Sequence, residues 1–188
     1  MKKMVLLIMW LWVLLLILSF VVIIVSLKYA EIWMLQITST DFKNNAFLWS
    51  KFTCDWSNLI PKLEISNLPE NTKSLAIIID DPDAPKNTFI HFLAWDIKTN
   101  WKTSLILFED NKDTFAWFTR WLNSFWNLQW WWPCPPVWHW IHRYFFKIYA
   151  LSKEKLDLEE WIDKETLLDA MQSYNLSYGE IIWLYKRD

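Results

Sequence analysis

The sequence predicts a mainly-β protein, a β-sandwich with a peripheral C-terminal helix, preceded by one N-terminal transmembrane helix. Three observations support this class. Short apolar or alternating runs, which are typical of strands, recur along most of the chain. Apolar residues repeat at helical spacing in one clear segment near the C-terminus. An uninterrupted apolar run without charges fills residues 4–27.

The N-terminal run is long enough to cross a bilayer. A helix over 4–27 would span about 36 Å, more than the roughly 30 Å of a hydrocarbon core. A secretory signal peptide is the alternative, but its apolar core is shorter and ends at a small-x-small cleavage site. We therefore predict an uncleaved signal anchor over 1–30. Because Lys2 and Lys3 precede the run, the domain over 31–188 is predicted to lie outside a cell membrane that the chain crosses once.

The strands follow from apolar patterning bounded by turn residues. The predicted strands are, in chain order, 35–38, 74–80, 89–97, 143–151 and 180–186. Alternation puts one set of side chains on a shared face of the third strand: Phe89, His91, Leu93 and Trp95. A second set shares a face of the fourth: His142, Tyr144, Phe146 and Ile148.

Two other segments complete the predicted domain. Asp163 can cap a helix on which apolar side chains recur at helical spacing. These side chains are Leu167, Leu168, Met171 and Tyr174. Residues 109–141 have little periodicity and read as a long ordered loop, which is usually functional inside a compact domain.

Charge and cysteine usage exclude several classes. The net charge of −2 gives no argument for a nucleic-acid partner. Cys54 and Cys134 lie eighty residues apart, which fits no CxxC-type zinc or redox motif. An extracytoplasmic compartment would permit a disulfide between them. Two free buried thiols remain the alternative, and no cofactor is predicted.

An acidic turn follows the most apolar strand. The stretch Ile77-Ile78-Ile79-Asp80-Asp81-Pro82-Asp83-Ala84-Pro85 is an apolar run that ends in a proline-fixed turn. Each proline pins its own φ and pushes the preceding residue toward extended geometry. A rigid turn of this kind can hold a carboxylate in one position. An ordinary surface turn is the alternative.

The histidines offer partners for these carboxylates. We predict one site made of Asp81, Asp83, His91 and His142, with Tyr144 as a wall, because histidine can donate to phosphate oxygens. A zinc site that uses His139-x-x-His142 with either carboxylate is a weaker alternative, because the pair lies in a proline-rich loop. No metal is therefore predicted.

Residues 80–85, 89–92 and 133–146 together resemble the phosphatidylethanolamine-binding protein family, most closely its bacterial Raf-kinase-inhibitor-like branch. The resemblance extends from about residue 35 to the C-terminus. It implies a two-sheet β fold with a small pocket for anionic groups such as phosphate, phosphoryl headgroups or acetate. The pocket residues that it implies are Asp81, His91, His142 and Tyr144, with Asp83 and the Pro135-Pro136 loop beside them.

The composition is unusual, with 17 Trp and 1 Gly. Average usage would give about 13 glycines in this chain, and tryptophan cannot replace glycine at positive φ. We hypothesise that many of these Trp letters stand for glycine encoded by UGA, as in some bacterial lineages. A genuinely Trp-rich chain is the alternative. Members of the family typically carry glycine at Trp56, Trp121, Trp126, Trp131, Trp132, Trp138, Trp140, Trp161 and Trp183.

These observations predict a non-enzymatic domain that binds a phosphate-bearing or other small anionic ligand and is attached to a membrane through its N-terminal helix. The first alternative is a protein inhibitor or signalling module that acts on a kinase or protease. The second is a hydrolase that uses Asp81 and His91 as acid and base, although no nucleophile is recognisable.

Overall fold

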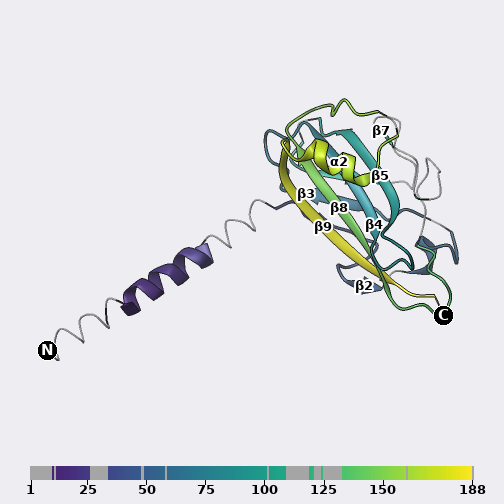
Figure 1. Ribbon diagram of the computed structural model, residues 1–188, viewed down its shortest axis with the longest axis horizontal. Helices are drawn as coiled ribbons and strands as arrows, with labels where there is room; N and C mark the ends of the chain where they lie inside the picture. The colour runs from purple at the N-terminus through teal and green to yellow at the C-terminus, as the bar shows by residue number, and fades with distance from the viewer. Residues whose placement is uncertain are drawn as a thin grey trace. The chain divides into compact units, whose positions relative to one another are not determined.

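The computed structural model describes residues 10, 12–25, 34–47, 49–57, 59–100, 102–108, 119–120, 124, 133–159 and 161–187. The chain divides into two units, Met1–Met34 and Leu35–Asp188 (Figure 1). The second unit contains all of the strands described below.

The first unit corrects one prediction. Residues 12–25 of this unit are helical. Within the described part of the chain, no helix is both long and apolar enough to cross a membrane. The predicted membrane-spanning anchor, and with it a single-pass protein of the cell membrane with an extracytoplasmic domain, is therefore wrong.

The second unit holds two sheets. The smaller sheet has the strand order β1-β3-β6 and the larger has the order β2-β9-β8-β4-β5-β7. All described strand pairs are antiparallel except β2 with β9, which is parallel. The elements are β1 (Gln36–Thr38), β2 (Ala46–Phe47), a 3-10 turn η1 (Ser50–Phe52), β3 (Leu63–Ser66), β4 (Ser74–Asp81), β5 (Phe89–Lys98), β6 (Leu105–Leu107), β7 (Thr119–Arg120), β8 (His142–Leu151), α2 (Lys164–Met171) and β9 (Asn175–Tyr185).

Hydrophobic cores lie on both faces of the larger sheet. One core is shared by the two sheets and includes Leu63 and Ile65 of β3 with Ile77 and Ile79 of β4. The other lies on the opposite face, where α2 contributes Leu167. Figure 1 shows α2 lying across that face. The predicted two-sheet β-sandwich with a peripheral helix is confirmed.

The alternating residues of β8 and the cap of α2 are also as predicted. His142, Tyr144 and Phe146 are all buried on one face of β8. The carboxylate of Asp163 accepts a hydrogen bond of 2.8 Å from the backbone N–H of Thr166, which caps the first turn of α2. β9 begins earlier than predicted because its pairing with β8 continues to the far end of that strand.

The predicted shared face of β5 is wrong, because a β-bulge interrupts its alternation. A register shift between β4 and β5 leaves His91 as the extra residue. Leu93 and Trp95 consequently lie in the core beneath α2. His91 points to the other side of the sheet and lines a pocket with Phe89. The bulge therefore turns a histidine that strict alternation would place under the helix toward that pocket.

The predicted loop over 109–141 is described only in part. It contains β7, which pairs with β5 opposite Ala94 and Trp95. It also contains residue 124 and the segment 133–141, which we call the wall segment. Trp121, Trp126 and the run 130–132 lie outside the described residues.

Gly179, Trp138 and Trp183 differ in whether the backbone and the packing around them favour glycine. A Cβ atom at Gly179 of β9 would lie 2.5 Å from the carbonyl oxygen of Leu35, so the chain needs its one glycine there. Trp138 has a φ of 65°, a conformation that favours glycine. Trp183, by contrast, is fully buried against Phe42 and Phe146. The hypothesis that Trp letters stand for glycine stays a prediction.

Candidate functional site

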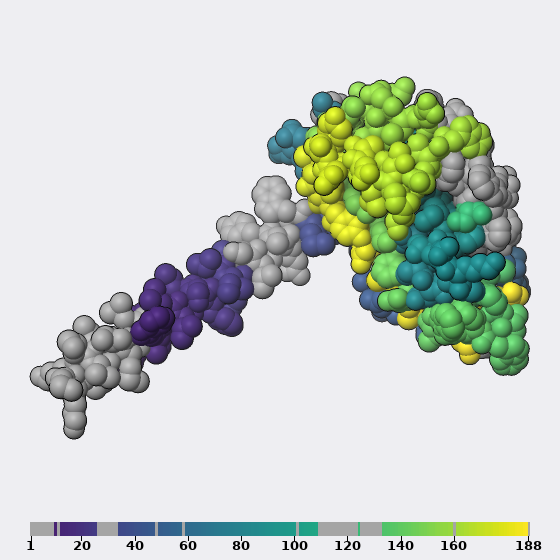
Figure 2. Space-filling model, viewed as in Figure 1, coloured from purple at the N-terminus to yellow at the C-terminus, as the bar shows by residue number. Residues whose placement is uncertain are grey.

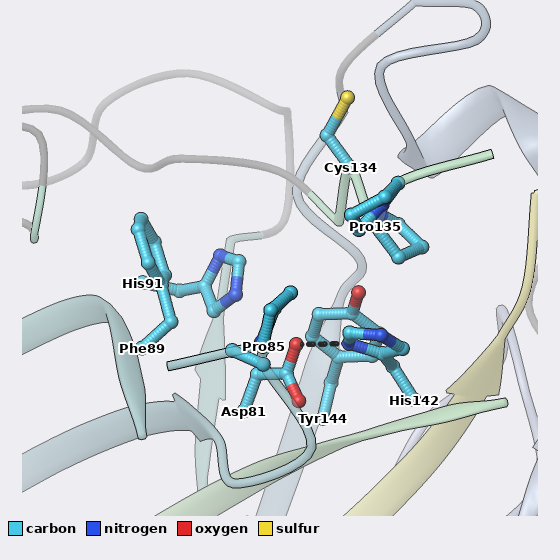
Figure 3. A pocket seen from close by; sticks show the side chains of 10 residues that line it. Asp81, Pro85, Phe89, His91, Cys134, Pro135, His142 and Tyr144 are labelled. Atoms are coloured by element: carbon cyan, nitrogen blue, oxygen red, sulfur yellow. Dashed lines mark hydrogen bonds and ion pairs between the residues drawn. The ribbon is translucent and has the colours of Figure 1, made fainter. Parts of the chain in front are cut away.

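A pocket of about 210 Å³ opens where β4 ends and where β5 and β8 begin (Figure 3). This volume exceeds the roughly 30 Å³ that one water molecule occupies and is smaller than the roughly 300–1,000 Å³ of pockets for drug-sized ligands. The pocket therefore suits a small ligand or one group of a larger ligand. Its lining residues are Asp81, Ala84, Pro85, Phe89, His91, Cys134, Pro135, Pro136, His142 and Tyr144.

The structure brings most of the predicted site residues together. Six of the seven line this one pocket: Asp81, His91, Pro135, Pro136, His142 and Tyr144. Asp83 does not line it. Its carboxylate instead binds Arg143, with Nε at 2.8 Å from Oδ2 and Nη2 at 2.9 Å from Oδ1. This bidentate ion pair lowers the pKa of Asp83, mainly through the hydrogen bond from Arg143.

The carboxylate of Asp81 organises the floor of the pocket. Asp81 is buried, and its Oδ1 accepts a hydrogen bond of 2.9 Å from the backbone N–H of Asp83 in the turn after β4. Its Oδ2 lies 2.6 Å from Nδ1 of His142, which is also buried (Figure 3). An ionised carboxylate can only accept, so Nδ1 of His142 donates in this pair. The Asp81 carboxylate thereby fixes the orientation of the His142 ring.

Tyr144 supplies a hydroxyl that stays protonated. Burial, followed by the negative charge of Asp81, raises the pKa of Tyr144 well above its ordinary range. The ring of His91 lies edge-on to Tyr144 with centroids 5.2 Å apart, and the ring of Phe89 lies 4.7 Å from that of His91. The protonated hydroxyl of Tyr144 and the imidazole ring of His91 thus share a partly aromatic enclosure.

The wall segment closes the pocket opposite the sheet. A disulfide joins Cys134 to Cys54, so the pairing proposed from the sequence is present. The backbone N–H of Cys54 donates to the carbonyl of Pro133 at 3.2 Å. Trp140 Nε1 donates to the carbonyl of Asp83 at 3.2 Å. Figure 2 shows the green atoms of this part of the chain beside the teal atoms of the turn after β4.

A network of one salt bridge and several hydrogen bonds links the wall segment to the end of β9 and to Asp55. Arg187 binds the carboxylate of Asp55, with Nε at 3.0 Å from Oδ1, and its Nη1 reaches the carbonyl of Pro135 at 3.5 Å. The hydroxyl of Tyr185 also donates to Asp55. This hydrogen bond from Tyr185, ahead of that from Arg187, lowers the pKa of Asp55. The end of β9 is therefore linked to the same segment that carries Cys54.

Sequence reasoning missed two features of this region. Phe89, two residues before His91, lines the same pocket and lies on the same side of the sheet as His91. His139 lies with its Nδ1 at 2.7 Å from Nε2 of His142. The spacing His139-x-x-His142 was the available signal, considered only as a metal motif. Among the described residues, no three His, Cys, Asp or Glu side chains are grouped so that they could hold a metal ion.

Comparisons with known proteins agree with the fold. The family model described as "Phosphatidylethanolamine-binding protein" matches residues 38–186. A UPF0098 protein of Pyrococcus horikoshii is 38% identical over 150 residues, which cover 79% of this chain and 75% of that protein. A UPF0098 protein of Aquifex aeolicus is 36% identical over 154 residues, covering 82% of this chain and 90% of that protein.

Two solved structures have the same overall fold. A phosphatidylethanolamine-binding protein homologue from Chlamydia trachomatis superposes with a TM-score of 0.72 at 29% identity and covers 83% of this chain and 99% of that one. E. coli YbcL, described as a new member of the mammalian PEBP family, superposes with a TM-score of 0.71 at 26% identity. It covers 82% of this chain and 99% of its own.

Fold and pocket together define a class of β-sandwich proteins with a small pocket at an end of the larger sheet. The family model covers most of the chain, and the relatives match over most of their own length. The chain belongs to the phosphatidylethanolamine-binding protein family.

Proposed function

We propose that this protein binds a small anionic ligand, such as a phosphate or a phosphoryl headgroup, without turning it over. The observation that carries the proposal is the convergence of His91, His142 and Tyr144 on one small pocket. Each of these side chains can donate a hydrogen bond to an anion. The match to a family named for binding a phospholipid supports the same ligand class.

The carboxylate of Asp81 does not oppose an anion as strongly as its charge alone suggests. Both of its oxygens already accept hydrogen bonds, one from the backbone of Asp83 and one from His142. Hydrogen bonds to a carboxylate spread and stabilise its charge. The guanidinium of Arg143 pairs with Asp83 and offsets the negative charge of that second carboxylate. The electrostatics of the pocket therefore permit a bound anion.

Calorimetric titration of the full chain with inorganic phosphate and with phosphorylethanolamine tests this proposal. Tyr144→Phe removes one donor, and the loss of a hydrogen bond to a charged group should weaken binding about 10-fold or more. Tyr149→Phe is the matched control, because Tyr149 lies on the same strand and packs against the core beneath α2. The double variant His91→Ala with His142→Ala should weaken binding further. Tight binding that survives that double variant would reject the assigned site.

Absence of turnover is a separate part of the proposal. Cys134 is the cysteine in the pocket lining. Because it is bound in a disulfide, it offers no thiolate as a nucleophile. A panel of phosphoesters incubated with the full chain should release no phosphate above the level given by the double histidine variant. Turnover that this variant abolishes would instead favour a hydrolase that uses Asp81 and His91.

A second candidate function is a protein inhibitor or signalling module. Phe47, Trp49 and Trp56 are each more than half exposed, and none of them lines the pocket. Exposed apolar side chains of this kind can contact a protein partner. A partner whose capture is lost on Trp49→Ser and Trp56→Ser but kept on Tyr144→Phe would favour this function over the first.

A further inference from the structure

His139 lies outside the pocket lining but contacts a residue that belongs to it. Its Nδ1 is 2.7 Å from Nε2 of His142. Its backbone N–H donates to the carbonyl of Pro136 at 3.1 Å, which closes a turn in the wall segment. The ring of Trp140 packs on the His139 ring with centroids 3.5 Å apart. Main-chain and side-chain contacts together therefore hold His139 against His142.

Both ring nitrogens of His142 are engaged in this arrangement. Nδ1 faces Asp81 at 2.6 Å and Nε2 faces His139 at 2.7 Å. With Nδ1 donating to the carboxylate, Nε2 of a neutral His142 accepts from the Nδ1–H of His139. The ionised oxygens of an anion also only accept hydrogen bonds. They cannot use His142 as a donor while Nε2 is occupied in this way.

We propose that His139 is an internal competitor that gates the anion pocket. Ligand entry requires Nδ1 of His139 to leave Nε2 of His142, which then takes a proton from solvent and donates to the anion. The inference rests on the proposed function. It adds to it a contact, present in the protein without ligand, that must break before an anion binds and that therefore lowers the affinity for the anion. His139 is thus a positioning residue that controls a binding residue.

Two substitutions separate the hydrogen bond of His139 from its packing. His139→Phe keeps a ring against Trp140 and removes the bond to His142. His139→Asn keeps an N–H group that can still donate to Nε2. Since one neutral hydrogen bond is worth a factor of roughly 2–10 in an equilibrium, His139→Phe should bind inorganic phosphate roughly 2–10-fold more tightly than the wild type. His139→Asn should stay near the wild type.

A double-mutant cycle distinguishes gating from a general structural effect. In a His142→Ala background, His139→Phe should leave the phosphate affinity unchanged, because the gated nitrogen is gone. Circular dichroism and the thermal midpoint of each full-length variant establish that it is folded.

The outcomes separate this inference from the proposed function. Tighter binding by His139→Phe, including binding where the wild type shows none, supports the gate. Wild-type binding that His139→Phe weakens or leaves unchanged overturns the gate but keeps the proposed function. A gain that persists in the His142→Ala background also overturns it. If neither the wild type nor His139→Phe binds phosphate, both the proposed function and the gate are rejected.

Discussion

Removing the Cys54–Cys134 disulfide should cost the protein both stability and ligand affinity. The bond closes a loop of 80 residues. The chain-entropy relation for a loop of that length gives about 4.5 kcal/mol of stabilisation at 25 °C. Because folded domains are stable by only about 5–15 kcal/mol, the double variant Cys54→Ser with Cys134→Ser should lose a large share of its free energy of unfolding.

Urea unfolding of the double serine variant and of the wild type measures this difference directly. Reducing agent should lower the unfolding midpoint of the wild type and leave that of the double variant unchanged, which controls for effects of the reductant itself. A loss below about 1 kcal/mol would refute the loop-entropy reasoning. It would mean that the unfolded chain is already restricted without the bond.

Phosphate affinity tests the local part of the same reasoning. The disulfide anchors the wall segment next to Pro135 and Pro136, which line the pocket. Without the bond, the segment keeps only weaker attachments there, such as the hydrogen bond from Cys54 N–H to Pro133 and the contact of Arg187 with Pro135. We expect weaker binding by the folded double variant. Unchanged affinity would show that these attachments hold the wall by themselves.

Three further predictions concern the Trp letters, Asp80 of β4, and Asp83 of the turn that follows β4. Trp138→Gly should stabilise the protein by about 1 kcal/mol in urea unfolding, because it relieves a left-handed φ, whereas Trp183→Gly should cost more than about 3 kcal/mol of buried packing. A stabilising Trp183→Gly would contradict the packing described here, and the mass of peptide 121–143 from the native host would show how many of its seven Trp letters are glycine. Asp80→Asn should destabilise by about 3 kcal/mol, since the buried carboxylate pairs with Lys147 at 2.8 Å and Lys164 at 2.6 Å, and thermal unfolding without a loss would reject that role. The pKa of Asp83 is lowered by Arg143, so its contribution to stability is complete above its unfolded value near 4 and is lost as the pH falls through the lower folded-state pKa. Asp83→Asn should therefore flatten the acid limb of the stability curve below about pH 4, and an unchanged slope would count against the ion pair.

Features set by local rules were predictable from the sequence. The shared face of β8 follows from strict alternation, and the start of α2 follows from the carboxylate of Asp163. The resemblance to the family placed Asp81, His91, His142 and Tyr144 in one site, and the structure brings them to one pocket.

Features set by pairing between distant segments were not predictable. The face of His91 depends on a bulge that exists only in the register of β5 against β4. The contact of His139 with His142 depends on a turn in the wall segment, which no periodicity indicates. The placement of Asp83 outside the pocket lining depends on its ion pair with Arg143 of β8. The membrane-spanning prediction depended on a count of apolar residues, and the described part of the chain contains no helix long and apolar enough to cross a membrane.

Adjacent acids in β4 have separate surroundings because successive side chains of a strand point to opposite faces. Asp80 faces the lysines on the side of α2, and Asp81 faces the pocket. Inserting or deleting a single residue within β4 would exchange the two, so that an acid suited to lysine partners would meet His142. The length of this strand is therefore constrained by chemistry on both sides of the sheet.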